Sequence, residues 1–422
     1  MFEPYGLGRF SGRQLALLWL LLSAGLLLRL LALDWGLPPT DLVRADAGLH
    51  DSYARGEGDF LEVLAQPSST RWATPQRALT LLALEAADIA GAFDGSWREA
   101  WQQMRPGAFE RVYAMARLVT VALNLLAVYL IAMVALRLGG VDTALWAAAL
   151  AALAPGLVLE AGQIRPETMV TACALLLWLA VLDGAPRRIG MLAVLVATAL
   201  AGAWVDDAYS SQESFLQTLA ALPRFWLGVP TALLAVAGAV LRWRRSSGAG
   251  RLFSALAVAA VVLLGDWLTV SALCLVAAAV AVTTAGRWGR PLGAAALFVA
   301  ASASFSVVSY RIAPHPINMA LLVVERVAKP GDHISRLPGG RRSIPAVYPY
   351  ARSDLAASPP EWVILTDLSP DSAPQPNLLA ERYERMAVFR RRSRTRWATL
   401  GESGAPEDWK RTRPELTIYR RK

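Results

Sequence analysis

Long apolar runs separated by short polar breaks occupy most of the first 310 residues of the chain. A helix needs about 17–25 mostly apolar residues to cross the hydrocarbon core of a bilayer. Nine candidate segments meet or approach this length. They cover residues 14–33, 113–136, 143–159, 167–183, 188–205, 225–241, 252–265, 267–285 and 291–310. The pattern predicts an all-α polytopic membrane protein with about nine transmembrane helices, and many spans after the first favour a retained anchor over a removed signal peptide.

Three regions lie between or beyond these runs. Residues 34–112 form a long first loop, in which the mixed segment 78–93 predicts a helix lying along the membrane interface. Residues 205–225 form a second loop on the same side. Residues 311–422 contain turn-bounded, β-rich stretches, EWVILTDLS (361–369) and PELTIYR (414–420), and a mixed one, AERYERMAVF (380–389). We therefore expect a transmembrane domain over 1–310 and a small α/β domain over 311–422.

Arginines in the short loops indicate the orientation, because basic loop residues mark the cytoplasmic side of a membrane protein. With the N-terminus inside, the inner loops hold Arg9, Arg13, Arg137, Arg187, Arg188, Arg242, Arg244, Arg245, Arg251, Arg287 and Arg290. The outer short loops are instead acidic, with Glu160, Glu167, Asp206, Asp207, Glu213 and Asp266 against Arg165 and Arg224. Nine spans then place both the first loop and the C-terminal domain outside the cell.

Composition supports the membrane assignment and narrows the chemistry. Hydrophobic residues make up 55% of the 422 positions and charged residues only 18%, whereas soluble domains are usually about a quarter charged. Lysine occurs only three times among the 42 basic residues, and this arginine bias is typical of bacterial coding at high GC content. Both cysteines lie within apolar runs, which argues against a disulfide framework. No phosphate-binding G-x-x-x-x-G-K-[ST] loop, histidine-rich metal motif or nucleic-acid-binding module is present.

The first half of the chain resembles the GT-C membrane glycosyltransferases. The resemblance rests on a first span ending in LRLLAL, an outer loop with an Asp soon after Pro-Pro, and the segments 116–140 and 154–182. The branch of the family that this chain resembles includes the protein O-mannosyltransferases and the bacterial lipid-A aminoarabinose transferases. These enzymes take a sugar from a polyprenyl-phosphate carrier at the outer face. The resemblance covers residues 14–183 well and is poor between 184 and 310. Members of the family usually have more spans than the nine predicted for this chain.

The family's most specific motif is an Asp-Glu pair in the first outer loop. The corresponding stretch here is RADAGLHD (44–51), so that Asp46 matches the Asp and Ala47 replaces the Glu. The resemblance implies that Asp46 is the general base, because a carboxylate can accept the proton of an acceptor hydroxyl as the new bond forms. His50 and Asp51 would lie about one turn away on a helix and could supply what Ala47 lacks. The alternative is that these residues are solvated loop positions.

A second signal, GQIRPETMV (162–170), lies where two predicted spans meet at the outer face. Arg165 could hold the carrier phosphate, because arginine binds phosphate oxygens with two parallel hydrogen bonds. Pro166 and Glu167 are equally typical of an ordinary helix start. The other candidate substrate-binding residues on this side are Arg44, Arg71, Arg111, Glu167, Asp206 and Asp207.

For four other ionisable positions we expect structural roles. Arg29, near the outer end of the first span, should extend its charge to the interface. Glu85 and Asp88 should mark the solvated side of the interfacial helix, and Asp266 should be a turn residue between two spans.

These observations predict a membrane glycosyltransferase of the bacterial cytoplasmic membrane. It would move a monosaccharide from a polyprenyl-phosphate donor to a lipid, glycan or protein acceptor at the outer face. Asp46 would act as the general base. The sequence identifies no cofactor and leaves the need for a divalent metal undecided. A non-catalytic assembly partner would explain Ala47, and a transporter or lipid flippase would explain the spans alone. No nucleic-acid partner is expected.

Overall fold

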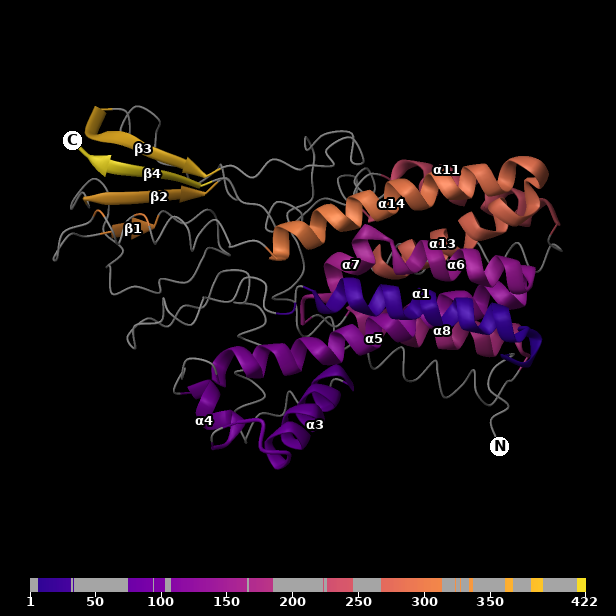
Figure 1. The fold of residues 1–422 in the computed structure, drawn as a ribbon, viewed down its shortest axis with the longest axis horizontal. Coiled ribbons are helices and arrows are strands. Elements are labelled where there is room, and N and C mark those ends of the chain that lie inside the picture. Colours follow the sequence, from indigo (N-terminus) through magenta and orange to yellow (C-terminus); the bar gives the residue numbers. More distant parts are fainter. Residues whose placement is uncertain are drawn as a thin grey trace.

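The structure is a computed structural model of the full chain. It describes residues 7–31, 33, 75–93, 95–102, 108–164, 167–184, 223, 226–245, 267–312, 323, 327, 334–336, 361–366, 381–389 and 416–422. Helices predominate among these residues, and a small sheet lies near the C-terminus (Figure 1).

The described helices of the transmembrane domain pack side by side in a bundle (Figure 1). They are α1 (Gly12–Leu30), α5 (Ala108–Gly139), α6 (Val141–Ala152), α7 (Pro155–Ala161), α8 (Glu167–Leu182), α11 (Val229–Arg245), α13 (Trp267–Thr284) and α14 (Gly289–Ile312), with short 3₁₀ turns η1 (Leu7–Arg9) and η5 (Gly286–Trp288). These helices cover every predicted span except 188–205 and 252–265, which lie outside the described residues. Ser11 caps the start of α1: its side chain accepts from the Gln14 N–H, and the Gln14 side-chain oxygen accepts from the Ser11 N–H.

Three of the described helices are long and apolar enough to cross a membrane, and the bent pair α6 and α7 would add a fourth. The α8, α11 and α13 helices are apolar but shorter. The described part of the chain therefore supports a membrane protein with several spans, and the count of nine stays a prediction. The predicted continuous span 143–159 is wrong in one respect, because α6 and α7 meet at an angle of 56°.

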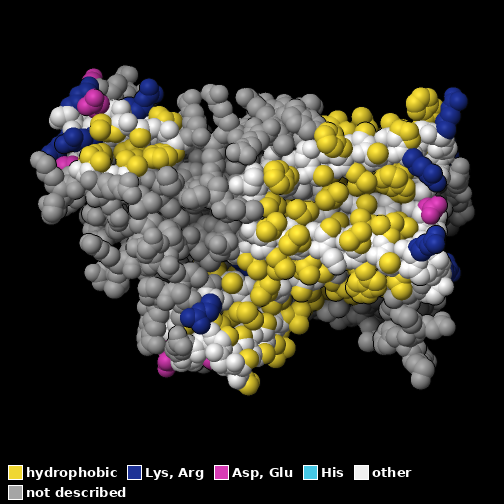
Figure 2. Space-filling view, in the orientation of Figure 1, with side chains coloured by type: hydrophobic (Ala, Val, Ile, Leu, Met, Phe, Trp, Pro, Cys, Tyr) yellow, Lys and Arg dark blue, Asp and Glu magenta, His cyan; other side chains and the backbone are white. Residues whose placement is uncertain are grey.

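The bundle has a broad hydrophobic outer face (Figure 2). Exposed apolar side chains of the bundle helices include Leu20, Leu27, Leu233, Val236 and Phe298. Basic side chains gather at one edge of this face in Figure 2. We call this edge the arginine end; its described basic residues, at the termini of the bundle helices, are Arg9, Arg13, Arg137, Arg244, Arg287 and Arg290. An apolar belt ending in arginines is the pattern expected of a bilayer-embedded domain with one cytoplasmic edge.

Two helices from the first loop pack on α5 at the opposite end of the bundle (Figure 1). They are α3 (Pro75–Ile89) and α4 (Trp97–Gln102), and α3 confirms a helix close to the predicted segment 78–93. With 32 residues, α5 is about 48 Å long and exceeds the hydrocarbon thickness of about 30 Å. Its N-terminal part forms a second core with α3 and α4, centred on Trp97 and Tyr113.

Four strands near the C-terminus form one mixed sheet in the order β1-β2-β4-β3. They are β1 (Ile334–Arg336), β2 (Trp362–Thr366), β3 (Tyr383–Phe389) and β4 (Leu416–Arg421). β1 runs parallel to β2, while β4 is antiparallel to both β2 and β3. The two predicted β-rich segments contain β2 and β4, the mixed segment 380–389 contains β3, and β1 was not predicted. Figure 1 shows the sheet apart from the bundle, on the side where α14 ends.

Candidate functional site

A stripe of polar side chains runs along one face of α5, inside the protein. Arg117, Thr120 and Asn124 are all fully buried, and their spacing of three and four residues places them on the same side of the helix. Such residues are costly within a membrane domain unless they bind partners, and they commonly mark functional positions. The stripe faces the end of α1 and the start of α3, and we call this region the α1–α3–α5 junction.

The residues on either side of segment 34–74 of the first outer loop bind to this stripe. The Arg117 Nη1 atom donates to the carbonyl oxygen of Leu33 at 2.6 Å, where the loop begins. The Gln76 Nε2 atom donates to the Thr120 hydroxyl at 3.3 Å, where the loop enters α3. Since Arg117 and Thr120 lie one turn apart, Leu33 and Gln76 bind to α5 close to one another. The predicted site residues Arg44, Asp46, His50, Asp51 and Arg71 belong to this loop and lie outside the described residues.

Arg29 is a buried member of the same junction, so the expectation that its charge extends to the interface is wrong. Its side chain is only 1% exposed. The Nε atom donates to Asn124 Oδ1 at 2.7 Å, and the Nη1 atom to the Gly25 carbonyl at 2.8 Å. Two further bonds reach the carbonyls of Ala152 at 3.1 Å and Ala151 at 3.4 Å. All of these partners are electrically neutral.

The break between α6 and α7 explains why Arg29 turns inward. Pro155 has no N–H and so makes no bond to the Ala151 carbonyl, four residues earlier. The bend then separates the Ala152 and Leu153 carbonyls from their normal helical donors. Arg29 binds the first two carbonyls, and the Ser304 hydroxyl donates to the Leu153 carbonyl at 2.7 Å. A guanidinium at a helix C-terminus is also favoured by the helix dipole.

Some polar atoms of the junction remain without a hydrogen bond although they are buried. Within the described part of the chain these include Gln76 Oε1, Thr80 Oγ1 and Asn124 Nδ2. A buried polar group left in this state costs about 1–3 kcal/mol, and native proteins hold few of them. The junction therefore offers hydrogen-bonding capacity to a water molecule or to a polar group of a ligand.

The junction also concentrates buried positive charge. Among the described residues, the buried charged side chains are Arg29, Arg77, Arg117 and Glu160. The three arginines lie on the elements that form the junction. Burial removes water that would screen these charges, so an anionic group arriving nearby would interact with them more strongly than at an open surface.

The connection from α7 to α8 lies against the same outer-loop helices. Ile164, directly before Arg165, is fully buried in the second core with Trp97 and Tyr113. Glu167 occupies the first turn of α8 and is half-buried, as its position in the sequence predicts. Glu160, which we expected in an outer loop, is instead buried at the C-terminal end of α7. Arg165, Asp206, Asp207 and Asp266 lie outside the described residues.

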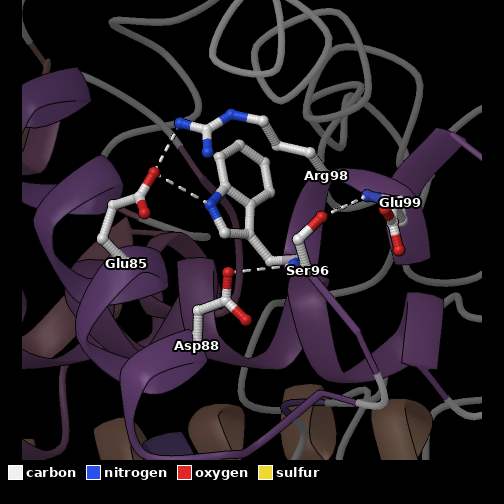
Figure 3. A network of polar contacts seen from close by, with 6 residues as sticks. Glu85, Asp88, Ser96, Arg98 and Glu99 are labelled. Carbon is white, nitrogen blue, oxygen red and sulfur yellow. Dashed lines mark hydrogen bonds and ion pairs between the residues drawn. The ribbon is translucent and has the colours of Figure 1, made fainter.

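The acids of α3 hold α4 in place (Figure 3). Glu85 accepts from the Trp97 indole N–H at 3.2 Å and forms an ion pair with Arg98. Asp88 accepts from the Trp97 backbone N–H at 3.4 Å. The expectation that Glu85 and Asp88 lie simply on a solvated face is therefore wrong, because both are half-buried acceptors for the start of α4.

Arg111 is the one candidate phosphate-binding arginine that lies within the described residues, and its side chain is exposed. Its Nη1 atom donates to the Ala92 carbonyl, after α3, at 2.9 Å. This bond ties the start of α5 to the end of α3, and it gives Arg111 a structural contact outside the buried junction.

Comparisons with known proteins give no relative for this chain. No protein family, no curated protein and no solved structure matches it. Within the described ranges, no group of three His, Cys, Asp or Glu side chains is arranged to hold a metal ion. The candidate site is therefore described by its own geometry.

Sequence reasoning missed the buried stripe of α5 and the role of Gln76. A signal was present, because Arg117, Thr120 and Asn124 interrupt an otherwise apolar span with helical spacing. The partner residues on α1 and α3 are far away in the sequence, so their pairing with the stripe is not visible there.

Proposed function

We propose that this protein is a membrane glycosyltransferase that uses a polyprenyl-phosphate-linked sugar as donor. The observation that carries the proposal is the α1–α3–α5 junction. It places three buried arginines, Arg29, Arg77 and Arg117, where the loop bearing Asp46 begins and ends. Three buried guanidinium groups beside this loop suit a donor whose reacting group is bound to phosphate.

The reaction needs two kinds of group, and the chain offers both in this region. As the sugar leaves its carrier, the lipid phosphate gains negative charge, which fixed positive groups in a water-poor site stabilise. Asp46 would accept the proton of the acceptor hydroxyl or amine as the glycosidic bond forms. The acceptor oxygen or nitrogen displaces the phosphate directly, and the anomeric centre is inverted. The acceptor is a lipid, a glycan or a protein.

Arg165 and Glu167 would complete the site from the other side. Ile164 brings their connection against the core of α3, α4 and α5, next to the helices that flank the loop. In this proposal Arg165 binds the carrier phosphate, and Arg44, Arg71, His50 and Asp51 contact the substrates from the loop. Asp206 and Asp207 would bind the acceptor or a divalent metal.

The proposed location is the bacterial cytoplasmic membrane, with the junction at the outer face. The arginine end would face the cytoplasm. The N-terminus then lies inside, and the C-terminal sheet lies outside with α3 and α4. Lipid-linked sugars are the fitting donors at that face because nucleotide sugars are made in the cytoplasm.

The experiment that tests this function compares lipid and glycan pools by mass spectrometry. Cells that produce the wild-type chain, the Asp46→Asn variant or no chain are extracted in parallel. A sugar-modified lipid, glycan or protein present only with the wild-type chain is the expected result. Identical pools from all three cell lines would contradict the proposal.

A non-catalytic assembly partner is the second candidate, and Ala47 favours it, since the family motif has Glu there. Such a protein would bind a polyprenyl-phosphate sugar without turnover. A lipid transporter is a third candidate, favoured by the broken span of α6 and α7 with buried Glu160. It would move the labelled lipid between leaflets of vesicles without breaking the sugar–phosphate bond.

A further inference from the structure

A second polar cavity lies at the arginine end, away from the proposed sugar-transfer site. It has a volume of about 480 Å³ and is formed where α6 begins, α13 ends and α14 begins. Its polar lining residues are Asp142, Thr283, Arg287 and Arg290, and Trp146, Val282 and Gly286 complete the wall. We call this cavity the inner pocket.

Close packing of small residues sets the shape of the inner pocket. Gly286 has a φ of +59°, a backbone conformation that side chains rarely adopt, and it turns the chain from α13 into η5. Gly289 lies so near the Val282 carbonyl that a Cβ atom would overlap it, and Gly293 packs against the Trp146 ring. The Thr143 and Thr283 hydroxyls share a hydrogen bond of 3.0 Å that joins α6 to α13 beside the pocket. The rim is therefore built from helices in direct contact.

The two arginines of the pocket are exposed, and no acidic side chain of the described residues pairs with them. Within the described residues, neither Arg287 nor Arg290 has an ion pair, although the Arg287 guanidinium lies 5.6 Å from the centre of the Trp288 ring. At the same end of the bundle Arg137 is paired with Asp183 at 2.7 Å. The pocket lining thus carries two positive charges against the single carboxylate of Asp142.

This charge pattern suits a phosphodiester. Arginine side chains bind phosphate oxygens in a directional, bidentate manner, and a threonine hydroxyl can add a further bond. The α6 and α14 helices both begin at the pocket, and the positive ends of their dipoles favour an anion. A general excess of arginine at the cytoplasmic edge explains the presence of basic residues. That general excess does not explain why Arg287 and Arg290, neither paired with an acid of the described residues, line the same cavity.

Apolar side chains next to the pocket indicate that the anion belongs to a lipid. Trp288 and Leu292 are 61% and 46% exposed, and Phe298 and Phe305 continue the exposed apolar surface along α14. This surface is part of the hydrophobic face that would contact acyl chains in a bilayer. Tryptophan is also typical of the interface between headgroups and hydrocarbon.

We propose that the inner pocket binds the phosphodiester headgroup of an anionic phospholipid, with the acyl chains lying along α14. Basic pockets between helices on the cytoplasmic side are suited to such headgroups. This inference is independent of the proposed sugar transfer, because it uses residues at the opposite end of the bundle.

The test measures binding of phosphatidylglycerol to the purified full-length protein by native mass spectrometry. The variant Arg287→Gln/Arg290→Gln should bind the lipid roughly 30-fold more weakly than wild type. The matched control Arg9→Gln/Arg13→Gln removes the same charge at the same end outside the pocket, and should change the affinity less than about 2-fold. Asp142→Asn should strengthen binding, which keeps the test informative if the double arginine variant fails to fold.

Four outcomes would overturn the proposal. An equal loss in the pocket and control variants would show general attraction to the surface. An unchanged affinity in the pocket variant, or weaker binding by Asp142→Asn, would exclude the site. Competition by soluble glycerol 3-phosphate at concentrations equal to the lipid would show that the pocket recognises a free phosphate and not a membrane lipid.

Discussion

The Nε atom of Arg29 donates a 2.7 Å hydrogen bond to Asn124 Oδ1, and this contact joins the end of α1 to the middle of α5 inside the bundle. The remaining donors of the same guanidinium bind carbonyls of α1 and of the broken α6. One side chain therefore connects three helices and donates to two carbonyls at the C-terminal end of α6, where the helix breaks before Pro155.

Replacing Arg29 should destabilise the whole transmembrane domain. Arg29→Met keeps a long side chain but removes the donor to the buried Asn124 Oδ1 and Ala152 carbonyl oxygens, and we expect a loss of about 2–5 kcal/mol. Thermal unfolding in detergent, followed by circular dichroism, measures the effect. Arg13→Gln, at the exposed start of the same helix, is the control and should leave Tm nearly unchanged. Equal Tm values for wild type and Arg29→Met would contradict this account of the break.

The pairing with Asn124 can be tested separately by a double-mutant cycle. Arg29→Met and Asn124→Leu each remove the hydrogen bond, so their effects should not add. The double variant should be more stable than the sum predicts by about 1–3 kcal/mol, as is usual for residues that share a buried polar contact. Additive losses would mean that the two residues do not interact in the folded protein.

The α11 and α13 helices should be sensitive to a single methyl group. A Cβ atom at Gly238 would overlap the carbonyl oxygen of Ala277, so the two helices must separate to admit alanine. We expect Gly238→Ala to cost about 1–3 kcal/mol, in the range of overpacked cores. Gly12→Ala, where no atom lies within 4 Å, is the matched control. A Tm for Gly238→Ala equal to that of the control would show that the helices pack less closely.

The α3–α4 unit should loosen when Glu85 is lost. Glu85→Ala removes the acceptor of the buried Trp97 indole and the partner of Arg98, which should cost about 1–3 kcal/mol. Limited proteolysis reports the effect as faster cleavage between residues 75 and 107. Glu99→Ala, an exposed position of α4, should be cleaved at the wild-type rate, and equal rates for both variants would refute the role of Glu85.

The C-terminal sheet should respond to alkaline pH through Tyr383. Burial raises the pKa of the Tyr383 phenol above its usual value of 10.0, although Arg421 and Arg382 act in the opposite direction. The unfolded chain then ionises first, so the stabilisation is complete below about pH 10 and is lost as the pH rises through the folded-state pKa. A difference titration of phenolate absorbance between wild type and Tyr383→Phe should show ionisation above pH 10. A titration centred at or below pH 10 would contradict the prediction.

Much of the helical architecture could be predicted because run length and apolar composition determine which segments are able to span a bilayer. The ends of α5, α8, α13 and α14 lie close to the predicted limits. The break at Pro155 was not predicted, since proline is tolerated within membrane helices when neighbours satisfy the freed carbonyls. Those neighbours, Arg29 and Ser304, lie more than 100 residues away in the sequence.

The candidate site was predictable only in part. The acidic loop drew attention to Asp46, and the proline-glutamate helix start correctly placed Glu167 in the first turn of α8. The buried charges were harder to predict, because an arginine near the end of a span usually reaches the interface. Arg29 departs from this rule because acceptors on α5 and α6 surround it, and only the packing of the helices brings them together.

The most direct test of the proposed function is the rate at which Asp46→Asn membranes consume a polyprenyl-phosphate sugar. Vesicles with equal amounts of wild-type or variant protein are given the lipid-linked sugar from the same cells, and release of polyprenyl phosphate is followed by mass spectrometry. Removing the general base should slow transfer by about 10²–10⁴-fold, while donor binding and Tm stay at wild-type values. A variant that releases polyprenyl phosphate at the wild-type rate would contradict the assignment of Asp46 and, with it, the central claim.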